Sequence, residues 1–471
     1  MTIEQFRKNW GIVIAVLLGA LVYMMPAQEG LSPEGHKALA LFAGVFILYL
    51  TESIPLVATG LLIAPAAVLM GIMKIGPALT SFASSSVFLM LGSFVLAAAM
   101  IKTNLAERIT YQILDKIGST TLRITVGIVL ANIVLSFLIH SSTAWTAIML
   151  PICMSVIQVF HTEGRTKFAV NLLITMAFTN ATISAGILTA TVPNPVTIEY
   201  IVNAGGNPIS YIDWLKIGFL PALIMTIITW AYIQWIYKPE FKEIPGGAAY
   251  VKEKIQQMGS MSRDEKFTFA IFILVAVLWC TGSITKIDST TACLFAAVLL
   301  FLPKVVVLTW KETNPHIGWN VLLLTGGGMS MGAILMKTGA SKWMASTIFS
   351  LFGLQSLSIV MLLFVVMVIA QFMHFFFAGT TVMATAMLPI IMALSTEAGL
   401  APAVLAIPAG MIIGGYPLLM FYCTSPNIMI YGNGELLNVG DFPKIGVPVS
   451  IIACIVYLIT ASTYWPWLGL F

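Results

Sequence analysis

Hydrophobic residues occur along this chain in long unbroken runs, and polar residues are mostly confined to the short segments between them. Runs such as Ile12–Met24 and Phe269–Leu278 do not alternate with a period of two, so they predict helices and not the strands of a barrel. About eleven membrane spans are predicted on this pattern. Their centres lie near Val16, Phe46, Ala64, Phe94, Ile174, Ile227, Val275, Ala297, Leu324, Met411 and Ile455.

Two further apolar segments differ from ordinary spans. Residues 122–160 and 357–394 each consist of two helical stretches that meet at a small polar tip. Such a pair forms either a re-entrant hairpin or two full crossings. Both forms leave the sidedness of the remaining spans unchanged.

The composition agrees with a membrane protein. The 471 residues are 59% hydrophobic and only 9% charged, with a mean hydropathy of +0.97. A soluble protein has about 25% charged residues, so this chain is predicted to be an all-α polytopic protein of the cell membrane. The 5 cysteines have no metal-site spacing, and we expect no metal, no cofactor and no nucleic-acid partner.

The basic residues indicate how the chain is oriented. Placing the N-terminus in the cytoplasm puts most of the 23 lysines and arginines on the inner side, as the positive-inside tendency requires. The C-terminus is then external. Residues 238–266 form a polar cytoplasmic linker whose mixed charges predict a solvated face. Residues 104–117 predict an amphipathic helix at the membrane surface, with Arg108 on its polar side.

This linker separates two halves that repeat each other. Three signatures recur in the same order at separations of 235, 238 and 233 residues. They are Lys102-Thr103 with Lys337-Thr338, Ser141-Ser142-Thr143 with Gly379-Thr380-Thr381, and Thr191-Val192-Pro193-Asn194 with Thr424-Ser425-Pro426-Asn427. An odd number of predicted spans lies between the two starts, so the halves enter the membrane from opposite faces. Inverted repeats with paired helix interruptions are typical of secondary transporters.

The repeat predicts the domain organisation. N-terminal scaffold helices occupy residues 1–83, and the first inverted repeat occupies 84–237 with a broken helix at 190–195. After the linker, further scaffold helices occupy 267–319. The second inverted repeat occupies 320–471, with a broken helix at 423–428.

The repeated segments also carry the predicted binding chemistry. A helix that begins at a hydroxyl tip or a Pro-Asn turn presents free N–H groups with partial positive charge, which bind carboxylates without a lysine or arginine. No lysine or arginine occurs in these segments, and two such sets suit a small substrate with two anionic ends. The candidate substrate-binding residues are Ser141, Ser142, Thr143, Thr191, Asn194, Gly379, Thr380, Thr381, Thr424, Ser425 and Asn427.

Each of these features has a plainer explanation when it is taken alone. Small hydroxyl residues let membrane helices pack closely, and Pro193 and Pro426 could be simple kinks. It is the duplication that favours a substrate site. His140 and His374 lie at membrane depth, where an ionisable group is a functional candidate, although either could only hydrogen-bond a neighbouring helix.

At these residues the sequence resembles the divalent anion/sodium symporter family, whose members carry succinate, malate, 2-oxoglutarate and citrate. The resemblance extends from about Gly11 to Tyr464. Family members have a Ser-Asn-Thr motif at each of two hairpin tips, at the positions of Ser141–Thr143 and Gly379–Thr381 here. The resemblance implies a homodimer in which each subunit has a scaffold domain and a transport domain that moves as an elevator.

The sequence departs from the family pattern at positions that concern sodium. The asparagine of each tip motif is replaced, by Ser142 and Thr380. In sodium-coupled members a hydroxyl residue four positions before each tip helps to hold sodium, and those positions are Phe137 and Phe375 here. Hard cations need oxygen ligands, so sodium coupling is not expected. His140 and His374 are candidates for the compensating positive charge.

The preferred interpretation is therefore a sodium-independent exchanger of C4 and C5 dicarboxylates (succinate, malate, fumarate, 2-oxoglutarate). A sodium- or proton-coupled di- or tricarboxylate symporter of the same fold is the nearest alternative, and an anion channel is a more remote one. A membrane enzyme is disfavoured because the chain has no H-E-x-x-H motif and no nucleotide-binding Gly-rich loop.

Overall fold

The computed structural model describes residues 3–26, 28–118, 120–139, 141–159, 164–242, 247–303, 306–432 and 436–469. These residues form helices joined by short loops, and no strand occurs among them. The predicted all-α polytopic membrane fold is confirmed. All eleven predicted span centres lie inside helices.

The first half of the chain contains a long series of helices. They are α1 (Ile3–Met24), α2 (Pro33–Thr51), α3 (Leu56–Leu69), α4 (Ile75–Leu79), the short 3-10 helix η1 (Thr80–Ala83), α5 (Ser85–Lys102), α6 (Leu105–Ile117), α7 (Thr121–Leu138), α8 (Ser142–Val159), α9 (Lys167–Ser184), α10 (Pro193–Asn203) and α11 (Tyr211–Ile236). Hydroxyl side chains fix several starts, because an N-cap oxygen accepts a free backbone N–H. Ser84 caps α5, Thr120 caps α7 and Thr166 caps α9.

The second half repeats this order after the linker helix α12 (Gly247–Met258). Its elements are α13 (Arg263–Thr285), α14 (Ser289–Leu299), α15 (Trp310–Thr313), η2 (Asn314–His316), α16 (Trp319–Lys337), α17 (Ala340–Leu351), η3 (Leu354–Ser356), α18 (Ile359–Met373), α19 (Thr380–Glu397), α20 (Pro402–Gly415), α21 (Ser425–Tyr431), α22 (Asp441–Ser462) and α23 (Tyr464–Trp467). The correspondence runs from α2 with α13 to α11 with α22. The structural repeat therefore begins earlier in each half than the three sequence signatures do.

Corresponding helices run in opposite directions. Ser84, at the start of α5, donates from Oγ to Met329 Sδ in the second half of α16 at 3.8 Å. Gly318, at the start of α16, lies against the ring of Phe94 in the middle of α5. Because the start of each helix lies beside the middle or the end of the other, α5 and α16 are antiparallel.

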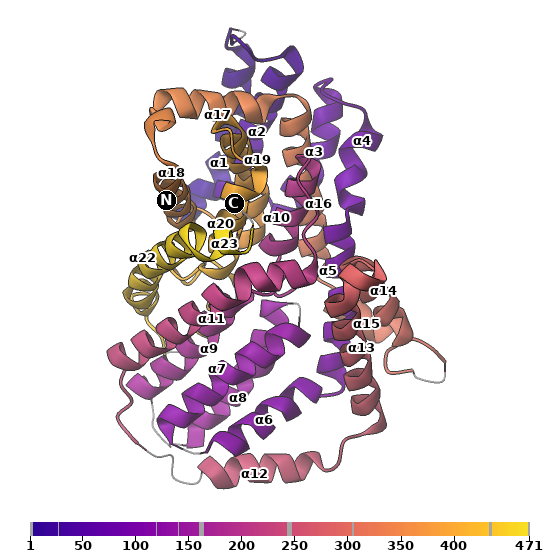
Figure 1. Cartoon of the computed structure of the whole chain (residues 1–471), viewed down its shortest axis with the longest axis vertical. Coiled ribbons are helices and arrows are strands. Elements are labelled where there is room, and N and C mark those ends of the chain that lie inside the picture. The colour runs from indigo at the N-terminus through magenta and orange to yellow at the C-terminus, as the bar shows by residue number, and fades with distance from the viewer. Residues whose placement is uncertain are drawn as a thin grey trace.

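The last long helices of the two halves pair in the same antiparallel way. Tyr237, just after α11, donates from Oη to Asp441 Oδ1 at the start of α22, at 2.6 Å. Tyr464, just after α22, donates from Oη to the carbonyl of Lys216 near the start of α11, at 2.7 Å. The two helices cross the middle of the molecule side by side (Figure 1).

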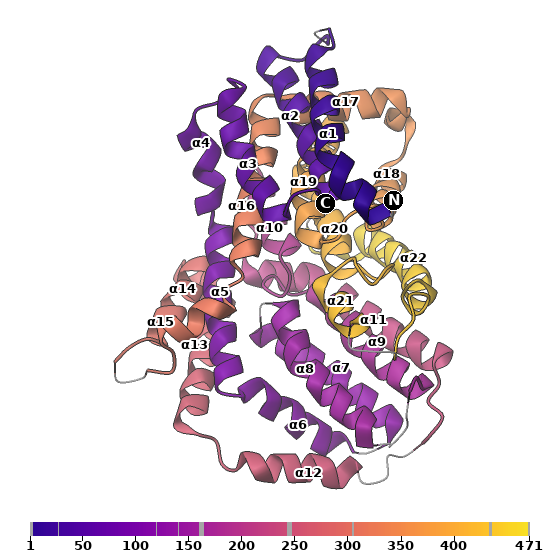
Figure 2. The ribbon, with the colours of Figure 1, turned by 180° about the vertical axis from the view of Figure 1, so that it is seen from behind.

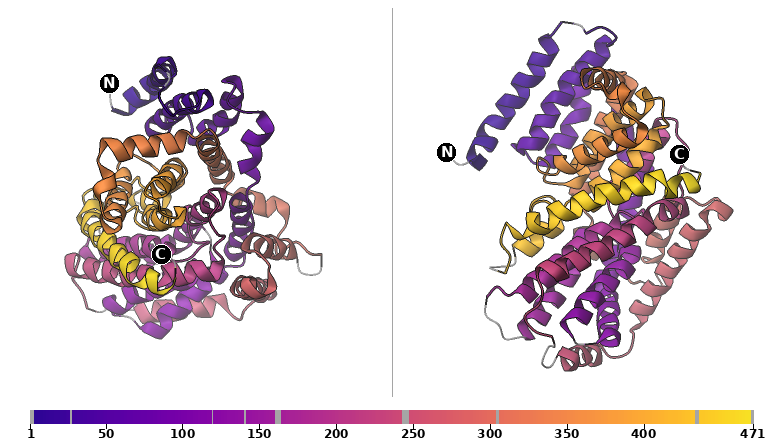
Figure 3. Two further views of the ribbon diagram at one scale, coloured as in Figure 1. Left: turned by 45° about the horizontal axis from the view of Figure 1, so that its top comes forward. Right: turned by 60° about the vertical axis from the view of Figure 1, so that its left-hand side comes forward.

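The figures show the arrangement of the remaining helices. Helices α1 to α4 lie at one end of the molecule with α16 and α17, and α6 to α9 lie at the other end with α12 (Figure 1, Figure 2). Helix α5 connects these two ends. The chain termini lie on opposite sides of the molecule in the right-hand view of Figure 3.

Seven described helices are long and apolar enough to cross a membrane: α5, α7, α11, α13, α16, α19, and α22 together with α23. Other apolar helices are shorter, including α3, α8, α14, α18 and α20. The predicted tips fall between helices, since α7 ends at Leu138 before α8 begins at Ser142, and α18 ends at Met373 before α19 begins at Thr380.

The polar linker departs from the expected solvated face at one point. Glu265 is buried and accepts from Arg108 of α6, with Nε to Oε1 at 2.5 Å. Arg108 also donates to the carbonyls of Met258 and Gly259. Arg108, which was expected on the polar side of a helix at the membrane surface, is buried, because this ion pair holds the end of the linker against α6.

Candidate functional site

The first broken helix is closed by an asparagine at the turn. Helix α9 ends at Ser184 and α10 begins at Pro193. Asn194 is fully buried, and its Nδ2 donates to the carbonyls of Ser184 and Ile187 at 2.9 Å each. These carbonyls lie ten and seven residues earlier, so one side chain holds the irregular loop between the two helices.

The second broken helix repeats this arrangement. Asn427 is fully buried, and its Nδ2 donates to the carbonyls of Pro417 at 2.8 Å and Met420 at 3.3 Å. These carbonyls again lie ten and seven residues earlier. The Oδ1 atoms of Asn194 and Asn427 are both buried and have no hydrogen-bond partner in the described part of the chain.

The two broken helices meet at the C-terminal ends of α9 and α20. A Cβ atom placed on Gly414 would lie 2.9 Å from Thr191 Cγ2 and 3.3 Å from Asn194 Oδ1. A Cβ atom on Gly415 would lie 2.6 Å from Ala185 Cβ. Only glycine allows this approach, which brings the first Pro-Asn turn against the second broken helix.

The second tip is anchored to the end of α20 through His374. This residue is buried, with Nε2 3.1 Å from the carbonyl of Ile413 and Nδ1 3.2 Å from the carbonyl of Gln371. Both ring nitrogens thus face carbonyl oxygens. A neutral imidazole donates from one nitrogen only, whereas an imidazolium donates from both.

Further contacts hold this tip against the loop between α20 and α21. Cys423 donates from Sγ to the carbonyl of His374 at 3.2 Å, and Tyr422 donates from Oη to the carbonyl of Phe375 at 3.0 Å. The ring of Phe375 stacks edge-on against Phe372 at 5.8 Å between centroids. The candidate sodium position at Phe375 is therefore occupied by a packed aromatic ring.

The first tip lies next to α11. The ring of Phe137 is 5.7 Å from that of Phe219, and Phe219 lies directly against Gly186 in the loop between α9 and α10. At the tip itself, Ser141 Oγ accepts from the backbone N–H of Ala144 at 3.2 Å. His140 lies outside the described residues.

The predicted site residues differ in exposure. Thr143 and Ser425 are exposed, while Asn194 and Asn427 are fully buried. The others are half-buried: Ser141, Ser142, Thr191, Gly379, Thr380, Thr381 and Thr424.

The helices that start at the site differ in their caps. Ser141 accepts from the first turn of α8, but α10, α19 and α21 have no side-chain cap. The first N–H groups of an uncapped helix are left for another acceptor, and this holds for α19 and α21. Helix α10 offers none, because Pro193 and Pro195 have no N–H and the N–H of Asn194 donates to the carbonyl of Thr191. The partial positive charge of these groups favours an anion.

Each second hairpin helix packs against the short helix of the opposite half, since α8 contacts α21 and α19 contacts α10. This cross-packing brings the hairpins and the broken helices into one structure.

Tertiary contacts also involve residues that the sequence analysis did not predict. Gln371 donates to the carbonyl of Tyr416 and to Ser450 Oγ, and Tyr200 donates to the carbonyls of Gly328 and Thr385. Gln371 could have been found from the sequence, because it is a polar residue inside the apolar run of α18.

Comparison with known proteins gives consistent results. The family described as "Sodium:sulfate symporter transmembrane region" matches residues 6–471. A membrane protein of Cupriavidus necator is 28% identical over 490 residues, covering 99% of this chain and 94% of the relative. The sodium-dependent dicarboxylate transporter SdcS of Staphylococcus aureus is 27% identical, covering 97% of this chain and 92% of the relative.

Two further matches agree. SdcS of Staphylococcus saprophyticus is 26% identical over 486 residues, with 97% of this chain and 92% of the relative covered. The crystal structure of the YdaH transporter of Alcanivorax borkumensis shares the fold at a TM-score of 0.55 and 12% identity, covering 99% of this chain and 98% of that one. Since the family match spans nearly the whole chain, this protein is a multi-pass membrane protein that belongs to the sodium:sulfate symporter family, the divalent anion/sodium symporters.

Proposed function

We propose that this protein transports C4 and C5 dicarboxylates, such as succinate, malate, fumarate and 2-oxoglutarate, across the cell membrane. The observation that carries the proposal is the identical closure of two oppositely directed broken helices by Asn194 and Asn427. Such paired breaks form transporter sites. The SdcS relatives, which are named as dicarboxylate transporters, support the substrate class.

The substrate would bind through hydroxyl groups and backbone N–H groups at the tips and turns. Helices α19 and α21 begin without a side-chain cap, so their first N–H groups can donate to carboxylate oxygens. The hydroxyls of Ser142, Thr380 and Thr381 would supplement them. The Nδ2 atoms of Asn194 and Asn427 are used within their own turns. They hold the turns in place and do not contact the substrate.

We further propose that transport is an exchange of one dicarboxylate for another without sodium. The packing of Phe137 and Phe375 supports this, because neither side chain offers an oxygen ligand. Burial opposes a charge on His374, but its two ring nitrogens face carbonyls near the C-terminal ends of α18 and α20, where partial negative charge collects. His374 would then supply a positive charge close to the substrate.

Sodium-coupled symport is the second candidate, and one observation favours it. The buried Oδ1 atoms of Asn194 and Asn427 lack partners in the described part of the chain. Amide oxygens are ligands for hard cations, and an unpartnered buried acceptor is costly. The SdcS relatives are also named as sodium-dependent.

We propose that the transport domain moves by an elevator mechanism relative to the scaffold domain. The protein would be a homodimer with a cytoplasmic N-terminus and an external C-terminus. The two halves differ in a way that supports such motion. Helix α19 packs directly on α16, with Thr385 against Gly328. In the first half, α8 instead lines a cavity of about 350 Å³ together with the end of α5, α6 and Lys254 of α12, so α8 has space to move toward these helices.

The test is uptake of radiolabelled succinate into proteoliposomes, with and without external sodium and with and without internal unlabelled dicarboxylate. Exchange predicts uptake that requires internal dicarboxylate and ignores sodium. Uptake into empty vesicles that rises with sodium would instead establish symport. A channel would show no acceleration by substrate on the far side.

A further inference from the structure

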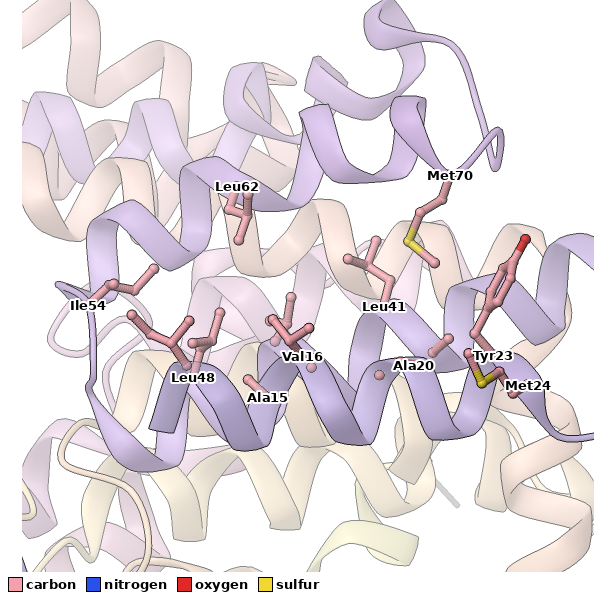
Figure 4. Close-up of a pocket in the computed structure, with 15 residues that line it drawn as sticks. Ala15, Val16, Ala20, Tyr23, Met24, Leu41, Leu48, Ile54, Leu62 and Met70 are labelled. Carbon is pink, nitrogen blue, oxygen red and sulfur yellow. The ribbon is translucent and has the colours of Figure 1, made fainter. Parts of the chain in front are cut away.

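An apolar groove lies between α1, α2 and α3, away from the candidate site. It has a volume of about 530 Å³. Figure 4 shows side chains of all three helices facing into it. They include Val16 and Ala20 of α1, Leu41 and Leu48 of α2, and Leu62 of α3.

Small residues in α1 and α2 shape this groove. A Cβ atom on Gly19 would lie 3.2 Å from the carbonyl oxygen of Ala40, and one on Gly44 would lie 3.2 Å from that of Ala15. The two helices therefore approach backbone to backbone. Helix α3 instead packs against α16, where Gly60 lies beside Leu324. The groove therefore has α2 at its base and α1 and α3 along its sides.

The chemistry of the lining selects the occupant. The phenol of Tyr23 is the one polar side-chain group in a lining that is otherwise apolar, and ordered water needs several polar partners. A hydrocarbon chain suits these walls. A methylene group is similar in size to a water molecule, whose share of liquid volume is about 30 Å³, so the groove has room for a single fatty acyl chain of common length.

One end of the groove carries a positive charge. Tyr23, Met24 and Met70 lie together at this end, and Leu48 and Ile54 lie toward the other (Figure 4). The next residue after Met70 is Gly71, and Lys37 Nζ is 3.6 Å from where a Cβ atom of Gly71 would be. An ammonium group at the end of a hydrocarbon groove is placed to meet an anionic headgroup.

We propose that this groove binds one acyl chain of an anionic phospholipid, with the lipid phosphate beside Lys37. The charge at one end and the room for one chain favour a lipid over a helix from a second copy of the protein. The site is independent of the dicarboxylate site and of its proposed function.

Native mass spectrometry of the purified full-length protein, titrated with phosphatidylglycerol or phosphatidylcholine, tests the proposal. Ala20→Phe fills the groove, and we expect it to weaken binding of one phosphatidylglycerol at least tenfold. Leu17→Phe is the matched control, because Leu17 lies on the same helix, is 63% exposed and does not line the groove. It should bind as the unmodified protein does.

The headgroup contact is tested without changing the apolar lining of the groove. Lys37→Gln should remove the preference for phosphatidylglycerol over phosphatidylcholine, while Lys342→Gln on α17 should keep it. The proposal is overturned if Ala20→Phe binds lipid normally, or if Lys37→Gln keeps the preference. It is also overturned if Ala20→Phe converts a dimer into a monomer, since the groove would then be an interface between two copies.

Discussion

Asn194 and Asn427 make the same two hydrogen bonds in the two halves of the chain, each from Nδ2 to the carbonyls ten and seven residues earlier. The helices that precede them, α9 and α20, meet at their C-terminal ends. The two turns are therefore equivalent, and the first lies against the end of the helix that precedes the second. This equivalence gives a direct test.

Asn194→Leu and Asn427→Leu should destabilise the protein to a similar degree. Each removes two hydrogen bonds of about 1 kcal/mol and with them the side-chain link across the loop. Thermal unfolding in detergent measures the loss, and dicarboxylate uptake should fall with it. Asn203→Leu, at an exposed position on α10, is the control. A clear drop in only one of the two variants would contradict the equivalence.

The tip hydroxyls should contribute to substrate affinity. Ser142→Ala and Thr380→Val each remove one proposed donor, worth about 1 kcal/mol, so the half-saturating succinate concentration should rise about fivefold. Uptake kinetics in proteoliposomes measure this change. Ser462→Ala removes an exposed hydroxyl at the end of α22 and should leave affinity unchanged. Unaltered kinetics in both tip variants would exclude the tips from the site.

His374→Gln should lower transport most strongly at acidic pH. A charge-compensating imidazolium is positive at low pH and loses its charge as pH rises. The variant has no such charge at any pH, and its uptake rate should vary little with pH. His316→Gln, at an exposed position, should retain the pH profile of the unmodified protein. Equal pH profiles for His374→Gln and the unmodified protein would remove the charge-compensating role.

Gly328→Ala should prevent the close packing of α16 and α19. The added Cβ atom would lie 2.3 Å from Thr385 Oγ1 and 2.5 Å from Thr385 Cβ, and overpacking of this kind costs about 1–3 kcal/mol. A lower unfolding temperature is the expected readout. Gly440→Ala is the matched control because nothing lies within 4 Å of its Cβ position. Equal stability of the two variants would mean that α16 and α19 are not packed this closely.

Two ion pairs should respond differently to loss of one charge. Arg108→Met leaves Glu265 charged and buried, which costs about 3–5 kcal/mol, so the unfolding temperature should drop markedly. Lys102 and Glu312 form an exposed pair at 2.7 Å. Hydrogen bonds from Lys102 and Thr309 lower the pKa of Glu312 to about 2. Lys102→Met should nevertheless change the unfolding temperature little, because water screens this pair. A larger loss in Lys102→Met would reverse this interpretation.

The sequence by itself determined the membrane setting, the helical class and the positions of the helix breaks. These features depend on local information. The length of an apolar segment shows whether it can cross the bilayer, and proline, glycine and hydroxyl residues start or end helices within a few positions. The signatures around Asn194 and Asn427 were visible because an internal duplication leaves matching residues at matching spacing.

Tertiary structure decided which of these segments meet. The burial of Arg108 against Glu265, the placement of His374 between two carbonyls and the contact of Gly328 with Thr385 join residues that hydropathy places on separate helices. Helix α12, in the polar linker, was also not predicted. Hydropathy is a property of single segments, whereas these contacts depend on how whole helices pack, and backbone approach through glycine is set by partners that are distant in the sequence.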